Sequence, residues 1–126
     1  MGKKDFQQLY LISQHLKKNN IHTKIIPCKT IRENNGIAIS SRNLFLREND
    51  RKILIKSIFF LKKYKKRINK NNIKFFIKKL NFFGIKKVEY LKILDLNSLK
   101  FKTSVKKNCN IFIAFYLDSI RLIDNF

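Results

Sequence analysis

Apolar residues recur at helical intervals in three stretches of the chain, which predicts three helices. The predicted helices span residues 5–19, 47–68 and 71–83. Asp5 and Gln8 have the spacing of a capping box, so the first helix is expected to begin at Asp5. The apolar stripes of the other two helices are Leu54, Ile58, Leu61 and Ile68, and Ile73, Phe76, Ile77, Leu80 and Phe83. Lysines fill the opposite side of the second helix, which is expected to face solvent.

Shorter apolar stretches between turn residues predict strands. They span residues 23–28, 37–39, 86–94, 111–117 and 120–123. The continuous apolar run 111–117 is typical of a strand that is buried on both faces. Two glycines mark boundaries: Gly36 closes a turn that begins at Glu33, and Gly84 is expected to cap the third helix. The order of two helices followed by three strands predicts a small α+β domain with an antiparallel sheet.

The composition allows one folded domain and changes the interpretation of the charge. The chain has 126 residues, of which 44% are hydrophobic, and a formal net charge of +21. Such a charge is typical of proteins that bind nucleic acid or anionic membranes. Lys, Asn, Ile and Phe are abundant, however, and their codons can be built wholly from A and T. An AT-rich genome would give this composition to any enzyme, so a dedicated nucleic-acid partner is not favoured.

Cysteines, histidines and hydropathy exclude several other classes of protein. Cys28 and Cys109 lack metal-ligand or redox-motif spacing, so both are expected to be reduced and structural. His15 and His22 are interpreted as surface or packing residues. The longest apolar run is too short to span a bilayer, and the first residues are polar, so a cytoplasmic protein is expected.

Three local patterns, in order, carry a resemblance to a known family. They are Gly2–Gln8 (Gly-Lys-Lys-Asp-Phe-Gln-Gln), Ile31–Asn43 (Ile-Arg-Glu-Asn-Asn-Gly-Ile-Ala-Ile-Ser-Ser-Arg-Asn) and Arg121–Asn125 (Arg-Leu-Ile-Asp-Asn). Val88–Leu91 and Leu94-Asp95 add weaker similarity. Together they resemble the carboxyl-terminal part of pantothenate synthetase, the ATP-dependent ligase that joins pantoate to β-alanine.

The resemblance implies a domain organisation. Residues 1–30 would be the tail, a helix and a strand, of a Rossmann-like nucleotide-binding domain, and residues 31–126 would be the lid domain with a phosphate-binding loop. The chain begins where the family would be about half finished, without the family's His-x-Gly-His element. A cut, a split gene and a misplaced start all fit this pattern. Asn35 also replaces the Asp that the family usually has before Gly36.

The family's reaction has two steps: pantoate attacks the α-phosphate of Mg-ATP to give pantoyl adenylate, and β-alanine then displaces AMP. The resemblance implies ATP, Mg²⁺, pantoate and β-alanine as ligands, a homodimer, and a complementary amino-terminal half if one is separately encoded. Negative charge accumulates on oxygen in both transition states, so positioned cations and hydrogen-bond donors are needed.

Residue roles follow from the same resemblance. Lys4 and Arg42 would be catalytic, and Ser40, Ser41 and Arg42 would bind the β- and γ-phosphates. Gly2, Lys4, Asp5, Ile31 and Ile39 would complete the ATP site, at the ribose, the phosphate and the adenine, and Gln8 would bind pantoate. From the residues alone, Lys4 is interpreted as a solvated lysine, Asp5 and Gln8 as a capping box, and Ser40–Arg42 as an ordinary turn.

Three hypotheses for the whole chain therefore stand side by side. It is a ligase fragment that is inactive alone, a basic module that binds nucleic acid nonspecifically, or a remnant that keeps the lid fold without activity. Salt-dependent DNA binding with no effect of ATP would favour the second.

Overall fold

The computed structural model describes residues 1–126 and consists of three helices and a three-stranded sheet. The helices are α1 (Phe6–Lys18), α2 (Glu48–Tyr64) and α3 (Ile73–Phe83), and the strands are β1 (Lys87–Asp95), β2 (Cys109–Leu117) and β3 (Ile120–Asn125). Short 3-10 turns precede α1 (Lys3–Asp5), precede α2 (Ser41–Phe45) and follow α2 (Lys65–Arg67). The predicted α+β class is confirmed, and each of these helices and strands overlaps the stretch predicted for it.

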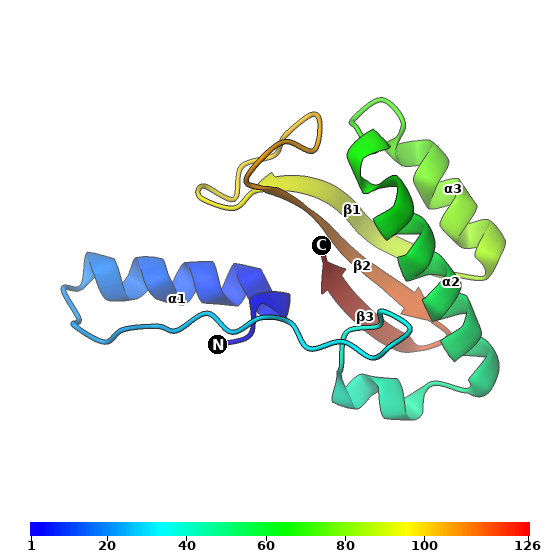
Figure 1. Ribbon diagram of the computed structural model, residues 1–126, viewed down its shortest axis with the longest axis horizontal. Coiled ribbons are helices and arrows are strands. Elements are labelled where there is room, and N and C mark those ends of the chain that lie inside the picture. The colour runs from blue at the N-terminus through cyan, green and yellow to red at the C-terminus, as the bar shows by residue number, and fades with distance from the viewer.

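The sheet is an antiparallel meander in the order β1-β2-β3. Helices α2 and α3 cover one face, while the start of α1 meets the opposite face and its far end extends away from the sheet (Figure 1). Side chains of β2 point alternately to the two faces. Ile111, Ile113, Phe115 and Leu117 join the core with α2 and α3. On the other face, the rings of Phe112 and Phe6 lie 5.9 Å apart. The central strand is thus buried on both faces, as its continuous apolar run predicts.

Helices α2 and α3 pack as their apolar stripes predict. Leu54, Ile58 and Leu61 on α2 are each at most 3% exposed, and Phe76 and Leu80 on α3 are also buried. Ile68 is buried too, but α2 ends at Tyr64, four residues before the predicted end, and Ile68 follows the 3-10 turn Lys65–Arg67. Gly84 follows α3 with a φ of 114°, so the predicted glycine cap is confirmed. The expectation that the lysine side of α2 faces solvent is wrong for Lys62. Its Nζ donates to the main-chain oxygen of Gly36 at 3.0 Å and ties α2 to the loop that precedes it.

The first thirty residues differ most from the prediction. The Asp5 side chain makes no capping hydrogen bond to α1, because Lys3–Asp5 form a 3-10 turn that leads into the helix. Residues 23–28 form no strand, and their contact with the start of the chain is a single parallel bridge between Gly2 and Cys28. Of the apolar side chains on α1, only Leu9 is buried.

A short hairpin stands where the strand 37–39 was predicted. Its residues make one antiparallel bridge, between Arg32 and Ala38, and do not extend into a ladder. The predicted turn is present: Gly36 has a φ of 87°, and its N–H donates to the carbonyl oxygen of Glu33 at 2.8 Å. Ile37 and Ala38 are buried, so the hairpin packs firmly beside β3. None of the helices is long and apolar enough to cross a membrane.

Candidate active site

Lys4 lies at the end of β3 because its main chain is fastened there. The side-chain amide of Asn125 donates to the carbonyl oxygens of Lys3 and Lys4, at 3.0 and 2.7 Å. The Lys4 ammonium then reaches the hairpin, where Nζ lies 3.5 Å from the carbonyl oxygen of Ile39. This arrangement brings together residues from both ends of the sequence.

A partly buried ion pair fastens the hairpin to the same strand. Arg32 donates from Nη1 and Nη2 to the two carboxylate oxygens of Asp124, both at 2.8 Å. It also donates to the carbonyl oxygens of Gly36 and Asn125, each at 3.0 Å. The Asp124 side chain is 5% exposed, so this fork-to-fork contact is shielded from water.

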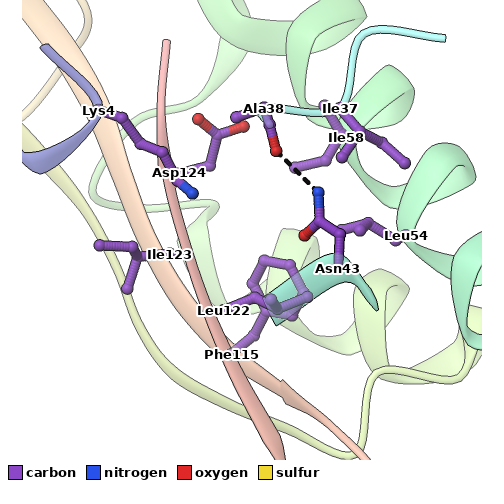
Figure 2. Close-up of a pocket in the computed structure, with 10 residues that line it drawn as sticks. All are labelled: Lys4, Ile37, Ala38, Asn43, Leu54, Ile58, Phe115, Leu122, Ile123 and Asp124. Atoms are coloured by element: carbon purple, nitrogen blue, oxygen red, sulfur yellow. Dashed lines mark hydrogen bonds between the residues drawn. The ribbon is translucent and has the colours of Figure 1, made fainter. Parts of the chain in front are cut away.

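The loop after the hairpin presents its polar side chains outward. Ser40 accepts a hydrogen bond from the N–H of Arg42 at 3.4 Å and caps the 3-10 turn Ser41–Phe45. Asn43 is buried and donates to the carbonyl oxygen of Ala38 at 3.0 Å, which holds the turn against the hairpin (Figure 2). Ser41 and Arg42 are exposed, and Arg42 contacts the carbonyl oxygen of Arg121 on β3. Ser40 and Asn43 therefore hold the loop in place, while the exposed side chains of Ser41 and Arg42 can bind a ligand.

The Lys4 ammonium is half buried among charged groups. Burial lowers the pKa of Lys4, the carboxylates of Asp5 and Asp124 oppose that shift, and Arg42 and Arg32 add to it. Figure 2 shows Lys4 beside Asp124 at the end of β3. Because Asp124 is already paired with Arg32, an anion that approached Lys4 and Arg42 would meet net positive charge.

A cavity of about 180 Å³ opens beside Lys4 between the start of α1 and the sheet. Gln8 and Asp5 line it from α1 and the turn before it, and Tyr90 and Arg121 line it from the strands. Burial raises the pKa of Tyr90, whose phenol can donate a hydrogen bond into the cavity. The predicted residues Lys4, Asp5 and Gln8 are thus brought to one hollow of the surface.

The remaining predicted site residues lie on the rims. Gly2, two residues before Lys4, is exposed and forms the parallel bridge with Cys28. Ile31 and Ile39 are opposite each other in the hairpin, joined by the bond from the Ile39 N–H to the Ile31 carbonyl oxygen at 3.0 Å. Both side chains are more than half exposed. Their apolar surfaces face outward beside the Ser40 loop.

Four residues that organise the site were not assigned a role from the sequence. They are Arg32, Arg121, Asp124 and Asn125. All belong to the quoted motifs, so the signal was present, but a linear pattern does not reveal that Asp124 pairs with Arg32 across 92 positions. No group of three or more His, Cys, Asp or Glu side chains could hold a metal ion.

The fold and the site define a small α+β domain that gathers cationic side chains from separate motifs at the end of one strand. The sequence model of the family described as Pantoate-beta-alanine ligase matches residues 1–126. The chain belongs to this family, and the resemblance that the motifs carry is confirmed.

Relatives agree with this assignment. The chain is 41% identical to pantothenate synthetase from Clostridioides difficile over 131 residues, which cover 99% of the chain and 46% of the relative. It is 36% identical to pantothenate synthetase from Ruthia magnifica, again covering 98% of the chain and 46% of the relative. The chain therefore spans about half the length of the curated relatives it matches.

Solved structures give the same result. A pantoate-beta-alanine ligase from Francisella tularensis, complexed with beta-gamma ATP and beta-alanine, aligns with a TM-score of 0.75 and 35% identity. The alignment covers 99% of this chain and 41% of that one. Pantothenate synthetase from Thermus thermophilus aligns with a TM-score of 0.78 at 22% identity, which supports the fold alone.

Proposed function

We propose that this chain forms the lid and one wall of a pantoate–β-alanine ligase site, which uses Mg-ATP to make pantothenate. One observation carries the proposal. Lys4 and Arg42 come from separate motifs, yet both are held on β3, Lys4 through Asn125 and Arg42 through the carbonyl of Arg121. Two cations aimed at one region are the arrangement that a polyphosphate requires.

In the first step, a carboxylate oxygen of pantoate attacks the α-phosphorus, and the bond to the pyrophosphate oxygen breaks. Lys4 supplies a compact positive charge, and its partial burial strengthens the attraction for phosphate oxygens. The fork of Arg42 and the hydroxyls of Ser40 and Ser41 bind the β- and γ-phosphates. Mg²⁺ arrives with the nucleotide, coordinated mainly by its phosphates.

In the second step, the β-alanine amine attacks the acyl carbon, AMP leaves with the bonding electron pair, and the proton lost by the amine passes to solvent. Gln8 faces the cavity of about 180 Å³, where its amide both donates to and accepts from the hydroxyl and carboxylate groups of pantoate. Gly2 and Asp5 lie at the ribose, and Ile31 and Ile39 border the adenine.

The family relationship also carries the wider organisation that we propose. Residues 1–30 belong to a nucleotide-binding domain and residues 31–126 to the lid. A complementary half supplies the second wall of the cleft, because donors on one side alone leave the transferring phosphate unrestrained. The homodimer and the cytoplasmic location stay predictions.

The test is a coupled assay for AMP release with pantoate, β-alanine and Mg-ATP. The chain is assayed alone, and then mixed with the part of the Clostridioides difficile relative that it does not match. We expect no turnover by the chain alone and turnover by the mixture that needs all three substrates. Turnover by the chain alone at the rate of the mixture would refute the need for a second wall. An inactive mixture of two folded, associated parts would refute the proposed function.

A further inference from the structure

Asn125 uses nearly all of its polar groups to join three segments. Its Nδ2 donates to the carbonyl oxygens of Lys3 and Lys4. Its N–H donates to Oδ1 of Asp124 at 2.8 Å, and its carbonyl oxygen accepts from Arg32 at 3.0 Å. The residue is 7% exposed, so these bonds are largely protected from competing water.

Lys4 itself has no comparable anchor. The five ion pairs of the protein involve Arg32, Arg51, Lys52, Lys86 and Arg121 as cations, and none involves Lys4. The one hydrogen bond of its ammonium is the 3.5 Å contact with the Ile39 carbonyl, at the outer limit for such a bond. The position of this charge therefore depends on its main chain, which Asn125 holds.

We propose that Asn125 is a positioning residue that holds the Lys4 ammonium at the phosphate loop. Its role in catalysis rests on the proposed function, because that function gives Lys4 its phosphate. The anchoring itself needs no nucleotide. An amide is required at this position, because a carboxylate there would turn an acceptor toward two carbonyl oxygens and repel the segment it must hold.

The pKa of Lys4 reports whether Asn125 positions its ammonium. This pKa would not change if Asn125 only stabilised the fold. Its ammonium is half buried and faces Asp5, Asp124, Arg42 and Arg32. If the segment detaches from β3, Lys4 returns to water and its lowered pKa rises toward the ordinary value of 10.5. Asn125→Ala removes the amide without adding charge, so the change reports position alone.

The experiment is an NMR titration of lysines reductively dimethylated with ¹³C-formaldehyde, in which Lys4→Arg identifies the Lys4 signal. We expect the Lys4 pKa to rise in Asn125→Ala. The matched control is Asn110→Ala, whose side chain contacts a different half-buried lysine, Lys65, at 3.2 Å. This variant should leave the Lys4 signal unchanged.

An unchanged Lys4 pKa in folded Asn125→Ala, with or without a lower Tm, would overturn the proposal. If this variant does not fold, Asn125→Ser, a smaller change that keeps a short donor, is judged by the same criterion. In the mixture with the complementary half, Asn125→Ala should raise the KM for Mg-ATP about tenfold and leave that for β-alanine unchanged. If Lys4 shifts but the unmodified mixture uses no ATP, the anchoring stands and only the proposed function fails.

Discussion

The guanidinium of Arg42 donates from Nη1 to the main-chain carbonyl oxygen of Arg121, at 3.1 Å. The contact directs the exposed loop toward β3 and occupies one of the five N–H donors of the fork. The other donors remain available at the surface. Arg42 thus has a fixed direction and spare binding capacity, the two properties that a phosphate contact needs.

Replacing Arg42 by Ala should lower adenylate formation at least about tenfold in the mixture with the complementary half, because a contact that strengthens in the transition state is lost. Folding should be unaffected, since the side chain is exposed. Pyrophosphate release measures the effect. Arg47→Ala, which removes an exposed arginine outside the loop, is the matched control. Unchanged pyrophosphate release by Arg42→Ala would contradict the phosphate role.

Replacing Asp124 by Asn should lower the free energy of unfolding by about 3 kcal/mol, because Arg32 is left as a largely buried, uncompensated charge. Urea unfolding measures this loss. Glu48→Gln is the control, since it removes one charge from an ion pair whose two side chains are 70% and 83% exposed. It should cost less than about 1 kcal/mol. Equal effects of the two substitutions would show that burial of the Arg32 pair has no energetic consequence.

Replacing Gly84 by Ala should destabilise the protein by about 1–2 kcal/mol, because its φ of 114° strains an L side chain. The new Cβ would also lie 2.6 Å from Cδ1 of Ile53. Thermal unfolding of the single and double variants tests both causes. Ile53→Val lacks Cδ1, so it should recover part of the loss. Gly2→Ala meets no atom within 4 Å and should be close to neutral.

Stability should depend on pH through Glu89. Hydrogen bonds from Arg121 hold the pKa of this carboxyl below its ordinary value of 4.5. The unfolded chain therefore binds a proton at higher pH than the folded one, and the stabilisation is lost as pH falls below about 4.5. Melting curves from about pH 6 to about pH 3 should show a flatter dependence in Glu89→Gln than in the unmodified chain. Parallel curves would rule out this contribution.

The sequence predicted correctly the helices and strands whose regularly spaced apolar residues are buried in the core. The apolar stripe from Leu54 to Ile68 and the apolar run 111–117 indicated which side chains face the core, and these residues supply much of the core in the structure. Residues 23–28 were predicted as a strand because they include the β-branched Thr23, Ile25 and Ile26. They make one bridge because the three-stranded sheet does not extend to them.

The motifs named candidate members of the site, whose roles stay predictions, but not the contacts that hold them in place. Lys4, Gln8 and Arg42 could be assigned because the motifs name them. The anchoring by Asp124 and Asn125 depends on contacts across 92 and 121 positions, and no local pattern encodes such pairs. The capping-box prediction was wrong at Asp5. The spacing of Asp5 and Gln8 is present, but Asp5 ends a 3-10 turn and its side chain makes no capping hydrogen bond.

The bond from Asn125 to the Lys4 carbonyl also determines when the cationic cluster can form as the chain is synthesised and folds. Lys4 precedes its anchor by 121 residues, so the cation has no fixed position until Asn125 has been synthesised. Contacts this distant in sequence carry the largest loop-closure entropy and form late in folding. The cationic cluster is therefore assembled only after β3 has been synthesised and has joined β2.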